Sequence, residues 1–160
     1  MKSEEELLKV ARKEGRKCIS LKQKFSDSFI EKCKDTIDWY WITYSQKLSE
    51  KFIEKYQNKV NWWGISHYQK LSEAFIEKYQ NKVDWKGISH SQKLSEKFIE
   101  KYQDKVEWHW ISQRQKLSED FVLNNFSKIN IRALKENKYF NFSNIKNKEL
   151  KLLLELRGEI

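Results

Sequence analysis

The sequence predicts an all-α protein, an α-solenoid of two-helix repeats that are 23 residues long. The pentapeptide Gln-Lys-Leu-Ser-Glu occurs at residues 46–50, 69–73, 92–96 and 115–119, which sets this period. Periods of this length are typical of solenoids, in which each repeat buries an apolar face against the next. Proline is absent and only four glycines occur, so tight β-turns lack their usual residues and helices lack their usual breakers.

Five repeats of 23 residues cover residues 19–133. One long continuous helix is excluded, because at about 100° per residue each repeat would turn an apolar stripe by about 140° relative to the preceding one. The chain has 160 residues, of which 39% are hydrophobic, which is enough to build a core. We therefore expect short helices in thin layers rather than a disordered chain.

Each repeat contains two expected helix starts. The first is a serine followed by glutamate, a combination that favours a helix N-terminus. These serines are Ser49, Ser72, Ser95 and Ser118. The second is the acid or amide at Asp38, Asn61, Asp84, Glu107 and Asn130. We expect a first helix over the pattern W-x-x-I-S-x-x-Q-K and a second over E-x-F-I-E-K-Y-Q-x-K, both too short to be stable without packing.

The chain ends are expected to cap the array, so that the whole chain forms one continuous domain. Residues 1–18 contain a predicted N-terminal capping helix over 3–14, which ends at Gly15. Residues 134–160 are predicted to hold a degenerate repeat, with Phe140 echoing a first helix, and a C-terminal capping helix that ends at Gly158. Terminal repeats of solenoids are usually atypical, because one of their faces meets water.

The charge and the cysteines limit the functional classes. The net charge is +9 but is spread along the chain, so no basic arm or block indicates a nucleic-acid site. Cys33 stands where other repeats have tyrosine, and we expect a buried thiol there; Cys18 and Cys33 have no metal-ligand spacing. The acidic N-terminus and the absence of a long apolar run predict a cytoplasmic protein without a membrane span.

The repeat core W-x-x-I-S-x-x-Q-K-L-S-E-x-F-I-E-K resembles short tandem repeats in poorly characterised proteins of large DNA viruses, phages and A/T-rich bacteria. The resemblance covers residues 19–133. It implies a helical array and a viral or phage setting, and it brings no defined chemistry.

Two residue types recur at one phase of the repeat. Trp39, Trp62, Trp85 and Trp108 are assigned to the core rather than to a ligand site. Gln23, Gln46, Gln69, Gln92 and Gln115 are expected to form a ladder of hydrogen bonds between helix ends, because a partly buried amide needs partners.

Positions that vary between repeats are the candidates for binding. The two residues after the recurring tryptophan, and those four positions later, share one face of the first helix. We predict that this face contacts a partner through Tyr40, Trp41, Tyr44, Trp63, His67, Tyr68, Lys86, His90, His109, Trp110, Gln113 and Arg114. Aromatic residues and arginine are frequent at binding hot spots. The alternative is that Trp41, Trp63 and Trp110 pack against neighbouring repeats.

Catalysis finds no support in the sequence, and we expect neither an enzyme nor a cofactor or metal. His67 and His90 share a phase, yet no carboxylate or cysteine lies at ligand spacing on the same face. The recurring serines lack a paired base, and no glycine-rich loop follows a strand.

The sequence thus predicts a non-catalytic scaffold that binds another macromolecule, with a protein as the first hypothesis. The alternative is nucleic-acid or ribonucleoprotein binding, for example by a phage-encoded inhibitor of a host defence system. This alternative uses the net charge and the recurring lysines Lys47, Lys70, Lys93 and Lys116. Self-assembly of the array is a third hypothesis.

Overall fold

The structure, a computed structural model, describes residues 6, 24–35 and 37–160, and every regular element within them is a helix. This confirms the predicted all-α helical repeat array. The chain divides into two compact units, Met1–Val83 and Asp84–Ile160, called here the N-terminal and C-terminal units. Apart from Glu6, the predicted helix over 3–14 lies outside the described residues, as do Cys18 and Gln23.

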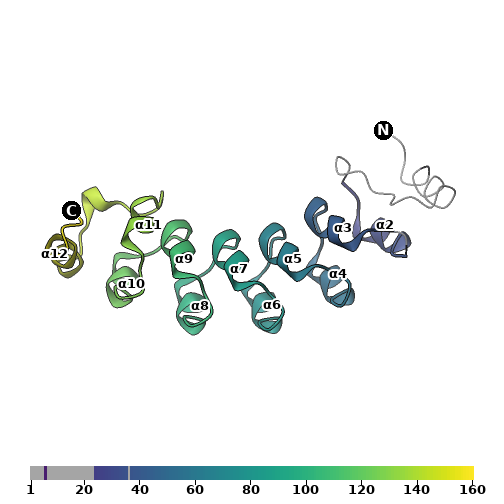
Figure 1. The fold of residues 1–160 in the computed structure, drawn as a ribbon, viewed down its shortest axis with the longest axis horizontal. Coiled ribbons are helices and arrows are strands. Elements are labelled where there is room, and N and C mark those ends of the chain that lie inside the picture. The colour runs from purple at the N-terminus through teal and green to yellow at the C-terminus, as the bar shows by residue number, and fades with distance from the viewer. Residues whose placement is uncertain (1–5, 7–23, 36) are drawn as a thin grey trace. The chain divides into compact units, whose positions relative to one another are not determined.

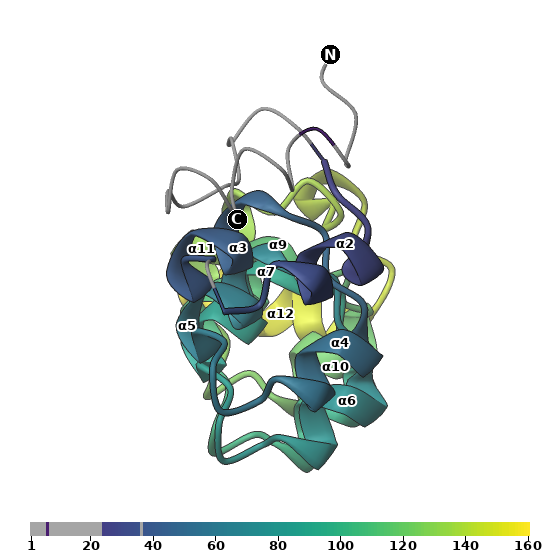
Figure 2. The same cartoon turned by 90° about the vertical axis from the view of Figure 1, so that its right-hand side faces the viewer.

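The described part of the N-terminal unit contains the helices α2 (Asp27–Lys32), α3 (Trp39–Ser45), α4 (Glu50–Lys55), α5 (Trp62–Tyr68) and α6 (Glu73–Lys78). Helices that begin at the recurring tryptophan are called A-helices, and those that follow the capping serine are called B-helices. The A-helices α3 and α5 pack against each other. They lie on one side of the unit, with α4 and α6 on the other (Figures 1 and 2).

The C-terminal unit repeats this arrangement with α7 (Trp85–Ser91), α8 (Glu96–Lys101), α9 (Trp108–Arg114), α10 (Glu119–Asn124), α11 (Ile131–Lys135), the 3-10 helix η1 (Phe142–Asn144) and α12 (Lys148–Leu156). The A-helix α9 packs between α7 and α11, and α10 packs against α12. Helices of like kind therefore stack repeat upon repeat, as Figure 1 shows for α7, α9 and α11.

Capping side chains start the helices where the sequence predicts. In the B-helix α4, Ser49 Oγ accepts a hydrogen bond from Phe52 N at 3.1 Å, and Ser72, Ser95 and Ser118 repeat this bond. In the A-helix α5, Asn61 Oδ1 accepts from Gly64 N at 2.8 Å. Glu107 is the exception, because its side chain makes no capping bond; glutamate is not among the favoured N-cap residues.

Both kinds of helix end earlier than the sequence patterns predict. B-helices stop at lysine, and the tyrosine that follows is a C-cap, with φ −112° and ψ 27° at Tyr56. A further turn, closed by a hydrogen bond from Val60 N to Tyr56 O at 3.1 Å, then buries Val60. A-helices stop before glutamine, since Gln69 is already extended with φ −94° and ψ 154°. Phe140 lies after α11 and not in a helix.

Isoleucine and phenylalanine of the two helix types form the core. Ile42, Ile53, Ile65 and Ile76 are at most 1% exposed in the N-terminal unit. The equivalent positions in the C-terminal unit, Ile88, Ile99, Ile111, Val122 and Leu134, are completely buried. Cys33 is a buried free thiol at 3% exposure, as predicted from the tyrosines at its phase.

Gln69 joins one repeat to the preceding one through three hydrogen bonds. Its Oε1 accepts from Leu48 N at 2.9 Å. Its Nε2 donates to Thr43 O at 2.7 Å and to Gln46 O at 2.9 Å. The amide is 5% exposed and therefore satisfies three buried backbone groups at the end of α3.

The same set of three hydrogen bonds, called here the glutamine clamp, recurs in the C-terminal unit. Gln115 accepts from Leu94 N at 3.0 Å and donates to Ser89 O and Gln92 O. Gln46 likewise accepts from Phe25 N at 2.9 Å. In the degenerate last repeat Asn137 takes the donor role, with bonds to Ser112 O at 2.7 Å and Gln115 O at 2.8 Å. The predicted glutamine ladder is thus confirmed at these positions.

The C-terminal helix α12 ends as the sequence predicts. Gly158 has a φ of 68°, a left-handed conformation that glycine adopts without steric cost. Its backbone N donates to Glu155 O, and Glu159 N donates to Leu154 O, both at 2.9 Å. The helices in residues 24–35 and 37–160 do not reach the length and apolar character that a membrane span requires.

Substituting Gln69→Ala is expected to lower the free energy of unfolding by about 2–4 kcal/mol, because three buried backbone groups lose their partner. Asn58→Ala is the matched control, since it removes an exposed amide from the same unit and is expected to change stability by less than about 0.5 kcal/mol. Chemical denaturation followed by far-ultraviolet circular dichroism measures both. Equal stability of the two variants would contradict a structural role for the clamp.

Candidate interaction surfaces

The recurring tryptophans are half-buried and engaged in packing. The ring of Trp62 stacks on Phe75 and lies 5.0 Å from the ring of Tyr79, both of which belong to the B-helix side of the same repeat. Its indole Nε1 donates to Gln57 O at 2.9 Å. With its polar atom bonded and one face covered, this side chain joins the A-helix to the B-helix.

A lysine ammonium group lies over the ring of each of these tryptophans. Lys82 Nζ lies 5.8 Å from the Trp62 ring centroid and donates to Gln57 Oε1 at 2.7 Å. Lys59, Lys105 and Lys128 lie in the same way over Trp39, Trp85 and Trp108. A cation over an indole face is favourable, so these lysines belong to the repeated packing unit.

Six predicted binding residues come together on the A-helices of the N-terminal unit. This aromatic cluster consists of Tyr40, Trp41, Tyr44, Trp63, His67 and Tyr68. Tyr44 lies at its centre, with ring centroids 4.5 Å from Tyr40, 4.9 Å from Tyr68 and 5.8 Å from Trp63. The cluster therefore bridges α3 and α5 as one continuous surface.

Most rings of the aromatic cluster are open to solvent. Trp41 is 50% exposed, Trp63 47% and Tyr68 56%. Phe52 on the neighbouring B-helix, in contrast, is 4% exposed. The rings contact one another, as in the stacking of Trp63 on His67 at 4.2 Å, yet leave a large apolar area in water, which is uncommon on a surface without a partner.

Gly64 allows α5 to approach α3 beneath the aromatic cluster. A Cβ atom at this position would lie 2.8 Å from Thr43 Cγ2 and 3.2 Å from Tyr44 Cε2. The equivalent positions in other repeats hold Trp41, Gly87 and Trp110. A larger side chain at position 64 would therefore meet Thr43 and Tyr44 of α3.

Burial raises the pKa of Tyr44 to about 12, and the neighbouring Tyr40 hydroxyl contributes to the rise. Ionising Tyr44 would place a negative charge among apolar rings, which burial disfavours. The centre of the aromatic cluster therefore stays neutral at physiological pH.

The A-helices of the C-terminal unit carry fewer rings and more charge. The ring of Trp110 on α9 meets the ring of His90 from α7 edge-on at 4.5 Å. The Arg114 guanidinium lies 5.7 Å from the Trp110 centroid, and His109 contacts the same ring edge-on. Lys86, by comparison, is exposed to solvent.

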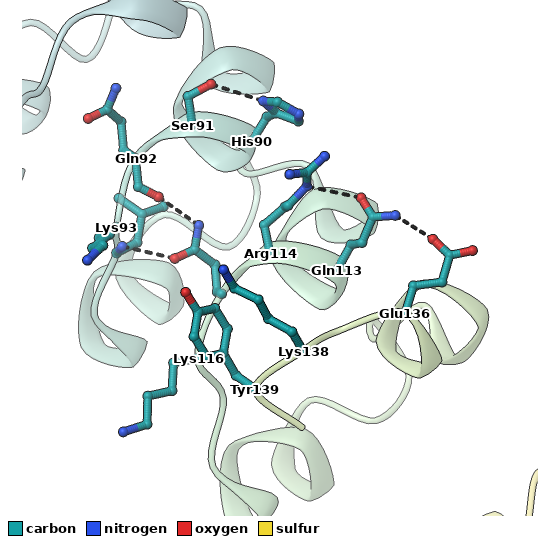
Figure 3. Close-up of a pocket in the computed structure, with 12 residues that line it drawn as sticks. His90, Ser91, Gln92, Lys93, Gln113, Arg114, Lys116, Glu136, Lys138 and Tyr139 are labelled. Carbon is teal, nitrogen blue, oxygen red and sulfur yellow. Dashed lines mark hydrogen bonds between the residues drawn. The ribbon is translucent and has the colours of Figure 1, made fainter. Parts of the chain in front are cut away.

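An open groove of about 600 Å³ lies beside these residues, between the ends of α7 and α9 and the segment that follows α11. This basic groove is lined by His90, Ser91, Gln92, Lys93, Leu94, Gln113, Arg114, Gln115, Lys116, Glu136, Lys138 and Tyr139. Figure 3 shows the side chains that converge on it from the three segments. It contains five of the predicted binding or lysine positions of this unit: His90, Lys93, Gln113, Arg114 and Lys116.

A chain of hydrogen bonds holds Arg114 at the basic groove. Arg114 Nε donates to Gln113 Oε1 at 3.2 Å, and Gln113 Nε2 donates to Glu136 Oε2 at 2.5 Å (Figure 3). The carboxylate therefore contacts the amide of Gln113 and leaves the terminal guanidinium nitrogens of Arg114 without a bond among the described residues.

The lysines of the recurring pentapeptide lie at the exposed ends of the A-helices. Lys47, Lys70, Lys93 and Lys116 are exposed, and no carboxylate among the described residues forms an ion pair with them. The B-helices differ: Lys55 pairs with Glu31 and Lys78 with Glu54. These contacts lower the pKa of Glu31 and raise the pKa of Lys55 and Lys78.

His67 and His90 have different surroundings. His67 stacks on Trp63, and His90 Nδ1 lies 3.0 Å from Ser91 Oγ. No group of three or more His, Cys, Asp or Glu side chains in residues 24–35 and 37–160 is placed to hold a metal ion.

Sequence reasoning missed three residues of the basic groove. Glu136, Lys138 and Tyr139 lie in the degenerate last repeat, which the sequence indicates as a cap. Asn137 between them is 4% exposed and lies one position before the residue that continues the 23-residue spacing of the buried glutamines. A strict 23-residue spacing points to Lys138 instead, so it does not identify this buried amide.

Comparison with family models, curated proteins and solved structures finds no match. The arguments for function therefore depend on the surfaces themselves. The aromatic cluster belongs to the N-terminal unit and the basic groove to the C-terminal unit, so each surface is considered separately below.

The raised pKa of Tyr44 predicts a loss of stability at alkaline pH. An unfolded tyrosine ionises near pH 10, whereas folded Tyr44 keeps its proton up to about pH 12. Between these values the unfolded chain binds fewer protons, so the free energy of unfolding falls as the pH rises. Denaturation at stepped pH is expected to show a smaller fall in Tyr44→Phe than in the wild type.

Tyr139→Phe is the matched control, because it removes one tyrosine hydroxyl from the exposed surface of the other unit. The control is expected to follow the wild type. A fall that is as large in Tyr44→Phe as in the wild type would show that another group causes it.

Proposed function

We propose that this protein is a non-catalytic repeat scaffold that binds another protein through the A-helix face. The observation that carries the proposal is the aromatic cluster, in which Trp41, Trp63 and Tyr68 are about half exposed and Tyr44 of α3 contacts the rings of Trp63 and Tyr68 of α5. Tryptophan and tyrosine dominate binding hot spots, because they bury a large area at a small entropic cost.

Rigidity of the supporting helices favours binding by this cluster. Gln69 ties the end of α5 to Thr43 O in α3, and the close approach at Gly64 holds the two helices together. A ring surface on a fixed backbone loses little conformational freedom when a partner covers it. The cluster lacks charged residues, which agrees with the composition of the centres of protein interfaces.

Nucleic-acid binding is the second candidate function. It is favoured by the exposed lysines Lys47, Lys70, Lys93 and Lys116, which no described carboxylate neutralises. Stacking of bases on exposed rings together with lysines on phosphates is a common mode of single-strand binding. A steep loss of affinity with added salt would be the signature of this mode.

The resemblance of the repeats to viral and phage sequences suggests a setting for either function. A host protein, or a ribonucleoprotein of a host defence system, is then a natural class of target. The absence of a nucleophile paired with a base in the sequence supports a binding role rather than a catalytic one.

The double substitution Trp63→Ala with Tyr68→Ala tests the aromatic cluster. Two hot-spot aromatics at about 2 kcal/mol each predict that binding of a protein partner weakens by roughly several hundredfold. Helical content is expected to remain, because both rings are about half exposed. Trp62→Ala is the contrasting variant: its ring is packed on Phe75, so its loss is expected to lower stability by about 2 kcal/mol or more.

The measurement is capture from a cell lysate on the tagged protein, with and without nuclease, followed by mass spectrometry. A protein retained after nuclease and lost with the double variant supports the proposal. The surface variant Lys51→Ala with Asn58→Ala serves as control and is expected to capture as the wild type does. Loss of all captured material on nuclease treatment would favour the nucleic-acid function, and unfolding of the double variant would assign the rings to packing.

A further inference from the structure

The basic groove of the C-terminal unit has a one-sided charge. Its lining includes the cations Lys93, Arg114, Lys116 and Lys138 against a single carboxylate, Glu136. All four cationic side chains belong to exposed residues, and among the described residues none of them forms an ion pair. Like charges gathered around a concave surface raise the local potential and attract an anionic ligand.

The floor of the basic groove offers few further hydrogen bonds. Gln115 is 4% exposed, and its amide is already bonded to Leu94 N, Ser89 O and Gln92 O. No buried side-chain nitrogen or oxygen among the described residues lacks a partner. A ligand therefore meets a closed, neutral floor and is recognised by the charged groups at the rim.

The guanidinium of Arg114 is held in an orientation that suits binding of a carboxylate. Its Nε is held by Gln113, which Glu136 holds in turn, so the guanidinium is oriented before a ligand arrives. The terminal nitrogens of an arginine form a planar fork that matches the two oxygens of a carboxylate. Orientation in advance reduces the entropic cost of binding.

The ring faces near the groove favour a peptide over a nucleic acid. Lys138 Nζ lies 4.9 Å from the centroid of Tyr139 and covers one face of that ring. Trp110 is contacted edge-on by His90 and faced by the Arg114 guanidinium. Base stacking needs an open ring face, whereas a carboxylate side chain needs the cations alone.

We propose that the basic groove binds an acidic, extended peptide segment, with carboxylates on Arg114, Lys138, Lys93 and Lys116. A volume of about 600 Å³ accommodates a few residues of such a segment. This inference deepens the proposed function, because it assigns an acidic segment to the protein partner. It concerns a different unit from the aromatic cluster and can be tested without that partner.

The experiment is fluorescence polarisation with a short labelled peptide of alternating glutamate and serine, at near-physiological salt. The comparison probes are the same peptide with glutamine for glutamate, and a uridine oligonucleotide of equal length. We expect the acidic peptide to bind to the full-length protein and to outcompete both comparison probes. Arg114→Gln with Lys138→Gln is expected to weaken its binding about tenfold, the combined effect of two exposed charge pairs.

Lys97→Gln with Lys148→Gln is the matched control, because it removes the same charge from exposed positions on α8 and α12. It is expected to leave binding within about twofold of the wild type, since distant exposed charges are screened by salt. Lys93→Gln with Lys116→Gln is a second groove variant. It replaces the first variant if circular dichroism shows that the first is misfolded, and it is expected to weaken binding of the acidic peptide in the same way.

Three outcomes would overturn the inference. They are absence of binding by the acidic peptide, equal weakening in the groove and control variants, and tighter binding of the oligonucleotide than of the peptide. The last outcome would assign the groove to nucleic acid. The Trp63→Ala, Tyr68→Ala double variant is expected to bind the acidic peptide as the wild type does, so failure of the aromatic cluster and failure of the groove are distinguishable.

Discussion

The buried glutamine that follows each A-helix is the interaction on which the repeated architecture depends. Gln69 and Gln115 each satisfy one backbone N–H and two carbonyl groups of the preceding repeat. An A-helix of seven residues is too short to be stable by itself, and its last carbonyls would be buried without partners. The glutamine side chain bonds the carbonyl groups at the end of the neighbouring A-helix, and by joining two repeats it stabilises a helix that is too short to be stable alone.

The remaining recurring residues act around this clamp. The tryptophan that starts each A-helix packs on phenylalanine and tyrosine of the B-helix, and its indole N–H is bonded to the preceding loop. The hydroxyl of the A-helix serine or threonine donates within its helix and accepts from the next repeat, as in the 2.9 Å bond from Glu107 N to Ser89 Oγ. Because these roles recur, the solvent-facing positions of the A-helix are free to differ from repeat to repeat.

Those differing positions give the two units different surfaces. In the N-terminal unit Tyr44 lies over Gly64, and the rings of α3 and α5 gather into the aromatic cluster. In the C-terminal unit His90 and Arg114 contact Trp110, and cationic side chains surround a groove. One kind of repeat therefore presents an apolar surface in one unit and a cationic surface in the other.

The sequence by itself determined the helical class, the period and the helix starts, because these depend on local signals such as Ser49 and Asn61 that act within a few residues. It also indicated which residues face solvent on the A-helix. The positions at which the helices end could be determined only from the tertiary structure. Gln69 has an extended backbone because its side chain bonds the backbone of another repeat. The basic groove was likewise decided by packing: Lys138 and Tyr139 follow no repeated pattern, and Asn137 places them beside Arg114 through bonds to distant backbone groups.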